Sequence, residues 1–315
     1  MQPRDVSAVS PSPSLSTREE NERATRDVSR VALVTSDLFP DLYEDDHPLR
    51  DALIERGVAV DAACWDDPGI DWAAYDLVVL RSPWDYPERR DAFVEWARSV
   101  PRLANPADII EWNTDKHYLG ELAAAGLPIT PTTFVEPGER WTPPQSGQWV
   151  IKPAISAGSR DTGRYELPAD LAAAQAHVER LSAAGRAVMV QPYLAAVDTS
   201  GETSVLCLPD EFGALTFSHA IRKGPLLTAT GERSGEYSEE ITARTPGEAE
   251  LDLAHRTLTL IPGGTKRLLY ARVDMIPGPD GAPLLLELEL TEPSLFFAFA
   301  AGAASRLAEA ILSRV

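Results

Sequence analysis

The pattern of hydrophobic and polar positions over the first hundred residues alternates between two kinds of segment. Short apolar runs predict buried strands, and amphipathic stretches with helical periodicity follow them. The strands are expected at residues 30–36, 58–64 and 77–80, and the helices at 48–56 and 88–100. Strands that alternate with helices are typical of a small parallel α/β domain.

Candidate substrate residues follow from this prediction. In parallel sheets, ligands bind beyond the carboxyl ends of the strands. Asp37 follows the first predicted strand, and the loop 81–86 follows the third. We therefore predict substrate roles for Asp37, Arg81 and Asp85. The aromatic residues of the same loop, Trp84 and Tyr86, are equally compatible with simple packing.

The pattern after residue 107 differs, because short strands, turns and single helices replace the regular alternation. Helices are predicted at 114–125, 169–184, 248–260 and 295–315, and strands at 132–135, 149–153, 187–194, 202–208 and 215–222. The predicted organisation is a disordered tail (1–29), an N-terminal α/β domain (30–107), a central subdomain (108–190) and a C-terminal subdomain (191–315). The polar segment 223–239 is predicted to be mobile.

A hairpin over residues 272–293 carries charged groups on one face. Because side chains alternate along a strand, Glu287 and Glu289 share a face, and Arg272 and Asp274 share a face of the partner strand. Like charges on one sheet face destabilise it without a counter-charge, which predicts a divalent cation. Oxygen ligands without His or Cys favour Mg²⁺ or Mn²⁺. The alternative is a solvated polar face. The opposite face is expected to hold Leu286, Leu288 and Leu290.

Charge and composition narrow the function. The formal net charge of −19 argues against a nucleic-acid partner, and no apolar run reaches the length of a membrane span. Because residues 1–29 lack the apolar core of a secretory signal, we expect a cytoplasmic protein. Only four of the 29 basic residues are lysines. Positions that keep Lys are candidates for sites that require a compact ammonium group.

Two of these lysines stand where an anion could bind. Lys116 lies at the start of the predicted helix 114–125, where a cation is unfavourable unless an anionic ligand is present. Lys152 ends a strand and precedes the Ser- and Gly-rich loop 156–163, whose backbone could approach phosphate oxygens closely. Neither a Walker motif nor a Rossmann fingerprint is present.

In their order and spacing, these features resemble the ATP-grasp superfamily of ligases, with a glutathione-synthetase-like arrangement from about residue 108 to the end. The resemblance implies an α+β ATP-grasp fold, in which an N-terminal parallel α/β domain precedes two α+β subdomains that clasp ATP between antiparallel sheets. It also implies roles for individual residues. In the family, the nucleotide is held by groups that match Lys116, Lys152, Ser156, Gly158, Ser159, Gln191, Leu194 and Glu202.

The resemblance further implies a metal and a catalytic set. Lys223, with Arg222 beside it, matches a cation near the γ-phosphate, and Arg272 matches the group that stabilises the oxyanion. Asp274 and Glu287 match ligands of two Mg²⁺ ions, with Mn²⁺ as an alternative. Where the family commonly has Asn, this chain has Glu289, and counting back from Pro293 gives Thr291 instead. The third ligand is open between these two residues.

The implied activity is ATP-dependent formation of a C–N bond through an acylphosphate of a small amino-acid-type substrate, releasing ADP and phosphate. Within the superfamily, loop 81–86 and residues 286–293 are most similar to cyclo-ligases that close O-ureidoserine to cycloserine. Intermolecular, dipeptide-type ligation is an alternative, and a homo-oligomer is compatible with either. Two rival readings are a serine hydrolase, from the degenerate nucleophile elbow around Ser156, and a nucleotide-binding protein without catalysis.

Overall fold

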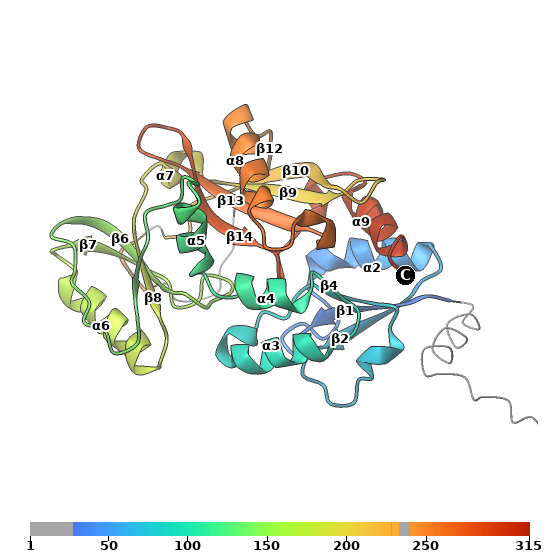
Figure 1. The fold of residues 1–315 in the computed structure, drawn as a ribbon. Coiled ribbons are helices and arrows are strands. Elements are labelled where there is room, and N and C mark those ends of the chain that lie inside the picture. The colour runs from blue at the N-terminus through green and yellow to red at the C-terminus, as the bar shows by residue number, and fades with distance from the viewer. Residues whose placement is uncertain (1–27, 228, 233–239) are drawn as a thin grey trace, which may run out of the picture.

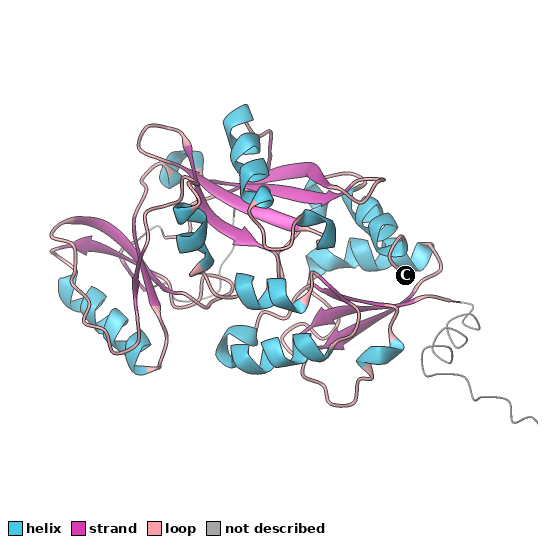
Figure 2. Cartoon of the chain, viewed as in Figure 1, coloured by secondary structure: helices cyan, strands magenta, loops and turns pink. Residues whose placement is uncertain are grey.

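The computed structural model describes residues 28–227, 229–232 and 240–315. The predicted disordered tail lies outside these residues except for its last two positions. So do residues 228 and 233–239 of the segment predicted to be mobile. The chain forms one parallel and two antiparallel sheets with helices packed on them, which confirms the predicted fold class (Figures 1 and 2). No helix in the described ranges is long and apolar enough to cross a membrane.

The N-terminal part is the parallel sheet, with strand order β2-β1-β3-β4. Its central strands are buried on both faces, as their continuous apolar runs predict. The helices α2 and α3 connect and cover the strands (Figure 1). The bounds are β1 Arg30–Thr35, α2 His47–Glu55, β2 Ala59–Cys64, β3 Leu77–Leu80, α3 Arg90–Ser99 and β4 Leu103–Ala104.

The central sheet has the order β11-β7-β6-β8-β5 and carries helix α6 on one face (Figure 1). Apolar side chains of the helix, among them Val178 and Leu181, pack with Ile151 and Val190 of the sheet. On the opposite face, Val150 and Lys152 line the cavity described below. The bounds are β5 Thr133–Val135, β6 Gly147–Pro153, β7 Gly163–Leu167, α6 Leu171–Ala183, β8 Val188–Pro192 and β11 Gly231–Glu232.

The third sheet has the order β12-β10-β9-β13-β14. Helices α4, α5 and α8 pack around β13 and β14, whereas α9 lies between β9 and helix α2 of the N-terminal part (Figure 1). The bounds are α4 Ala107–Asn113, α5 Tyr118–Ala124, α7 Val197–Ser200, β9 Glu202–Pro209, β10 Leu215–Lys223, β12 Ile241–Arg244, α8 Glu248–Thr259, β13 Ala271–Pro277, β14 Pro283–Glu289 and α9 Ala303–Leu312. The proposed subdomain boundaries stay a prediction.

Two predicted helices are wrong in extent. The helix expected at 114–125 starts only at Tyr118, and a helix that was not predicted, α4, precedes it. Lys116 therefore lies in the turn between two helices rather than in a first helical turn. The C-terminal helix begins at Ala303 instead of residue 295, because Phe296 and Gly302 have left-handed backbone conformations (φ +50° and +83°) that interrupt helical geometry.

A β-bulge in the hairpin corrects a third prediction. Asp274 pairs with Glu287, but Met275 pairs with Leu285, so Leu286 is the extra residue. The core position is taken by Leu285 together with Leu288 and Leu290. Leu286 instead lines the cavity described below. The strict alternation of the sequence pattern does not foresee this.

Candidate active site

A cavity of about 990 Å³ lies where the N-terminal part and the two antiparallel sheets meet. Strands β6 and β8 supply one wall, and β9, β10, β13 and β14 supply the other. Most of the predicted site residues line it together. They are Lys116, Lys152, Ser156, Gly158, Ser159, Gln191, Leu194, Glu202, Lys223, Arg272, Asp274, Glu287 and Glu289.

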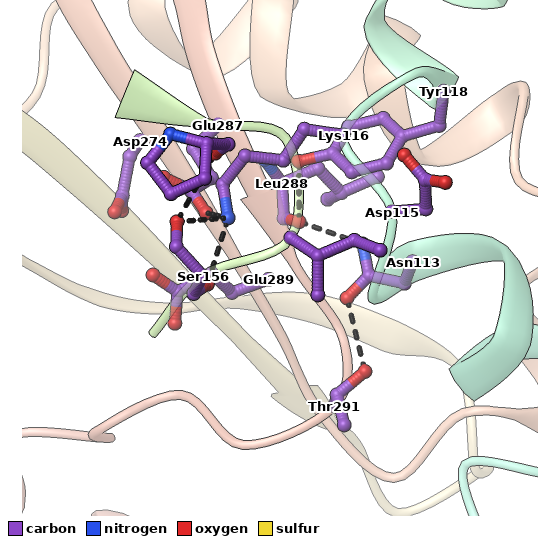
Figure 3. Close-up of polar contacts among 12 residues, drawn as sticks. Asn113, Asp115, Lys116, Tyr118, Ser156, Asp274, Glu287, Leu288, Glu289 and Thr291 are labelled. Carbon is purple, nitrogen blue, oxygen red and sulfur yellow. Dashed lines mark hydrogen bonds and ion pairs between the residues drawn. The ribbon is translucent and has the colours of Figure 1, made fainter. Parts of the chain in front are cut away.

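Lys116 reaches the cavity from the buried turn between α4 and α5. Its Nζ lies 3.0 Å from Oε1 of Glu287 and donates to the backbone oxygen of Ser156 at 2.9 Å (Figure 3). Burial acts to raise the pKa of Glu287, but the nearby charges of Lys116 and Lys152 outweigh it and hold the pKa below its usual value. One lysine thus ties the central loop to the hairpin.

A second set of ion pairs lies on β10, β13 and β14. Nζ of Lys223 is 2.7 Å from Asp274, and the Arg272 guanidinium donates to both oxygens of Asp274 at 2.9 Å and also contacts Glu289. Burial opposes ionisation of Asp274, but the two cations lower its pKa further than burial raises it. Lys223, Arg272 and Asp274 are therefore charged near neutral pH.

Lys152 differs from these cations. Its ammonium group forms no ion pair or hydrogen bond with any residue that the structure describes, although the residue lines the cavity. Burial lowers its pKa, and the neighbouring charge of Lys116 contributes in the same direction, against the attraction of Glu287. An anionic ligand would relieve this unfavourable state.

Glu289 and Glu292, the two acids nearest the end of the hairpin, have raised pKa values, unlike Asp274 and Glu287. Burial, reinforced by Asp274 and Glu287, raises the pKa of Glu289 to about 7 despite the Arg272 charge. Burial and the charge of Glu289 raise the pKa of Glu292 to about 8. The cavity is therefore short of positive charge at this end.

The cavity residues fit ATP and Mg²⁺ if the lysines exchange their carboxylate partners for phosphates. No group of three or more acidic, His or Cys side chains among the described residues is placed to hold a metal by itself. Asp274 and Glu287 are occupied by Lys223 and Lys116. Nucleotide phosphates would give the lysines new partners and supply further oxygen ligands, so that the released carboxylates and the phosphates together could hold Mg²⁺. The donor set, oxygen without His or Cys, suits this ion.

Four predicted residues do not line the cavity. Arg81 is fully buried and bonded to Asp46 (2.7 Å) and to the backbone oxygen of Pro293 (2.7 Å). Asp85 accepts from Trp65 and pairs with Arg89, and Asp37 is exposed.

Arg222 is the fourth residue. It donates to the backbone oxygen of Ser200. Its neighbour on β10, Lys223, faces the cavity, and strand alternation turns Arg222 away.

Several lining residues were missed by the sequence reading. Within loop 81–86 it is Trp84 and Tyr86, rather than the charged residues, that reach the cavity. Glu292 reaches it as well; this residue lies within the predicted hairpin 272–293 but beyond strand β14, which ends at Glu289. Asn113 lies at its edge and pairs with the backbone of β14, donating to the oxygen of Leu288 (Figure 3). Only the aromatic composition of the loop was a signal in the sequence.

Ser156 does not have the setting of a nucleophilic serine. No helix follows it before strand β7 begins at Gly163. Its hydroxyl oxygen lies 3.3 Å from Nζ of Lys116. The strand-to-helix elbow of a serine hydrolase is therefore absent at this position.

Comparison with known proteins places the chain. Residues 31–105 match the family model of the N-terminal domain of D-cycloserine synthetase DcsG. The cycloserine biosynthesis protein DcsG of Streptomyces lavendulae is 34% identical over 306 residues, which is 90% of this chain and 98% of that protein. The chain belongs to the cycloserine synthetase family of ATP-grasp ligases.

Solved structures of this superfamily agree with the fold. The crystal structure of D-cycloserine synthetase DcsG superposes with a TM-score of 0.78 at 32% identity, covering 91% of this chain and 99% of that one. ATP-grasp ligase PsnB, complexed with its minimal precursor, Mg and ADP, superposes with a TM-score of 0.55 at 21% identity, covering 90% and 97%. The protein is accordingly an ATP-dependent ligase with the ATP-grasp fold.

Proposed function

We propose that this ATP-grasp ligase closes O-ureidoserine on itself, with ATP, to form the ring of cycloserine. The observation that carries the proposal is the identity of 34% with a cycloserine biosynthesis protein, which extends over nearly the whole of both chains. A cavity lined by three lysines and by several carboxylates supports it, because such a cavity can hold ATP and an amino acid together.

In this proposal, the lysines that line the cavity bind the nucleotide. Lys116 and Lys152 hold the α- and β-phosphates, and Lys223 faces the γ-phosphate. The side chain of Gln191 lies 2% exposed at the strand end beside Leu194, where adenine would stack, and Glu202 takes the ribose hydroxyls. The loop with Ser156, Gly158 and Ser159 covers the phosphates and excludes water, which would otherwise hydrolyse an activated carboxylate.

Asp274 and Glu287 would hold Mg²⁺, and we assign two ions, with Mn²⁺ as a substitute. The metal would supply positive charge that offsets the charge of the phosphates. We choose Glu289 over Thr291 as the third residue, because Thr291 is buried against Asn113 and does not line the cavity. Glu289→Gln should lower the affinity for Mg²⁺ measured by calorimetry without nucleotide, and Thr291→Val should not.

The reaction proceeds in three steps on the substrate. The substrate carboxylate attacks the γ-phosphorus and becomes an acylphosphate, and ADP leaves. The nitrogen bonded to the side-chain oxygen then attacks the acyl carbon and loses its proton, the C–N bond forms and phosphate leaves. Water finally hydrolyses the carbamoyl group from that ring nitrogen, which releases carbon dioxide and ammonia and leaves cycloserine. Arg272, held by Asp274, directs its guanidinium toward the oxyanion that develops at that carbon.

The test uses the purified full chain with Mg²⁺, ATP and each enantiomer of O-ureidoserine. We expect ADP and phosphate to form in step with cycloserine identified by mass spectrometry. Lys152→Ala should abolish turnover, whereas Lys266→Ala, which changes the exposed lysine outside the cavity, should not. ADP release only with a second amino acid, and a product of dipeptide mass, would replace ring closure by intermolecular ligation.

Cellular placement and assembly complete the proposal. We assign the protein to the cytoplasm, where ATP and Mg²⁺ are available, and allow a homo-oligomer. Fractionation of the producing cells and light scattering of the purified chain test these two assignments directly.

A further inference from the structure

We propose that the carboxylate of Glu292 binds the protonated α-amine of the amino-acid substrate. This inference rests on the proposed function, since it requires an amino-acid substrate in the part of the cavity that Glu292 lines. Glu292 follows the metal-binding hairpin and lines the cavity together with Trp84 and Tyr86 of the N-terminal part.

The backbone that carries Glu292 is held on both sides by side chains. The carbonyl oxygens of residues 292, 293 and 294 accept from Trp84 Nε1 (3.0 Å), Arg81 Nη2 (2.7 Å) and Arg272 Nη1 (3.2 Å). The N–H groups of residues 295, 296 and 297 all donate to the carboxylate of Asp45, at 2.7 to 3.0 Å. A segment fixed at six successive residues presents the Glu292 side chain rigidly, as a binding group requires.

Glu292 lacks the cation that each of its neighbouring acids has. Asp274 is paired with Lys223, Glu287 with Lys116 and Glu289 with Arg272. Within the described part of the chain, no basic side chain forms an ion pair with Glu292. The Tyr86 hydroxyl forms a hydrogen bond with its carboxyl group. Burial and the like charge of Glu289 raise the pKa of Glu292, against the smaller effects of Tyr86 and of the Lys116 charge.

An ammonium group is the kind of ligand that the surroundings of Glu292 favour. It supplies the missing positive charge to Glu292, and burial makes such a charge pair strong. The rings of Trp84 and Tyr43, whose centroids lie 4.9 Å apart, line the same end and favour a cation at their faces. Arg272 contacts the backbone oxygen of Ser294, two residues beyond Glu292. A substrate whose carboxylate faces Arg272 would therefore have its α-amine on the Glu292 side.

The first experiment compares two substrates on the wild-type protein. O-ureidoserine and its des-amino analogue, 3-(ureidooxy)propanoic acid, both have the reacting carboxylate and nitrogen, but only the first carries the α-amine. We expect kcat/KM to fall by about 10- to 100-fold for the analogue, the usual range for losing a hydrogen bond to a charged group. Equal kcat/KM for both compounds would overturn the inference without any variant being made.

The second experiment asks whether Glu292 is the group responsible. In Glu292→Gln, the KM for O-ureidoserine should rise by about 10- to 100-fold, the KM for ATP should stay unchanged, and discrimination against the des-amino analogue should disappear. Glu292→Asp should recover part of the discrimination. Glu95→Gln, an exposed acid on α3, serves as the control and should match the wild type.

Each other outcome has a distinct meaning. A fall in kcat with unchanged KM in Glu292→Gln would overturn the inference in favour of a proton-transfer role. A larger rise in KM for Glu44→Gln, an exposed acid lining the same cavity, would move the amine to the rim and also overturn it. If the wild type fails to convert O-ureidoserine, the proposed function fails. If it converts both substrates equally, only the role of Glu292 fails.

Discussion

Two buried arginines, Arg81 and Arg272, have almost the same surroundings. Each is at most 5% exposed and pairs with one aspartate, Asp46 or Asp274. Each donates to a backbone carbonyl of the segment after the hairpin, at residue 293 or 294. Each guanidinium also lies near an aromatic ring, that of Tyr270 at 5.1 Å or that of Phe296 at 5.6 Å.

The difference lies in what the remaining side of each guanidinium faces. Arg272 lines the cavity, has Glu289 as a second acidic partner and shares Asp274 with Lys223. Arg81 does not line the cavity, and its guanidinium donates to Asp46 and to the backbone oxygens of Leu80 and Pro293. Burial and ion pairing are thus alike in the two arginines. Contact with the cavity distinguishes Arg272, for which we propose a catalytic role, from Arg81.

Replacing Arg81 should have the largest effect on stability. Arg81→Met leaves Asp46 buried without its cation, which should lower the free energy of unfolding by about 3–5 kcal/mol. Urea denaturation measures this loss. The double variant Arg81→Met, Asp46→Leu should recover much of it, because it leaves no unpaired charge. A rise in substrate KM with unchanged stability would instead restore the substrate role predicted for Arg81.

Replacing Arg272 should act mainly on catalysis. Arg272→Lys keeps a positive charge but loses the planar fork, and kcat should fall by about 10²- to 10³-fold, as for removal of one oxyanion donor. The stability loss should be smaller than in Arg81→Met, since Lys223 still pairs with Asp274. Steady-state kinetics and thermal melting report the two quantities. A variant with full kcat and a large loss of stability would make both arginines structural.

Replacing Lys152 should change ATP binding without lowering stability. Lys152→Met should raise the KM for ATP by about 10- to 100-fold, because a charged phosphate contact is lost. The free energy of unfolding should stay the same or rise, since no ion pair with a described residue is broken. Lys266→Met, at an exposed lysine, is the matched control. An unchanged KM for ATP would place the phosphates elsewhere.

The smallest predicted effect is on the pH dependence of stability. It involves His219 and the backbone carbonyl of Leu295, which follows residues 293 and 294. His219 Nε2 donates to the backbone oxygen of Leu295 at 2.8 Å, and burial lowers the pKa of His219. Because the folded-state pKa lies below the unfolded value near 6.5, its contribution is complete above that value and is lost as pH falls below it.

His219→Phe should therefore have a flatter stability profile below pH 6.5, by up to about 1.4 kcal/mol per pH unit. Urea denaturation at several pH values between 5 and 7.5 measures the profile. His177, whose pKa is also lowered by burial, remains in the variant and should leave part of the acid dependence. Identical profiles for variant and wild type would show that His219 titrates alike in both states.

The sequence predicted the groups that one strand or one turn determines. The face shared by Arg272, Asp274, Glu287 and Glu289 follows from alternation along the hairpin, and all four line one cavity. Lys116 and Lys152 were found from their scarcity and their positions next to strand and helix ends, although the helix near Lys116 begins later than expected. These are local properties, fixed by covalent geometry and periodicity.

Tertiary structure alone decided which of the remaining polar groups face the cavity. Arg81, Asp85, Trp84 and Glu292 all belong to polar loops, yet packing of the N-terminal part against residues 291–297 buries the first, turns the second to Arg89 and brings the other two to the ligand side. The bulge at Leu286 and the late start of α9 are also visible only in the folded chain. The sequence shows which side chains are present, but residues as far apart as Arg81 and Pro293 come into contact only in the folded chain. The burial of each polar group and its protonation state depend on such contacts.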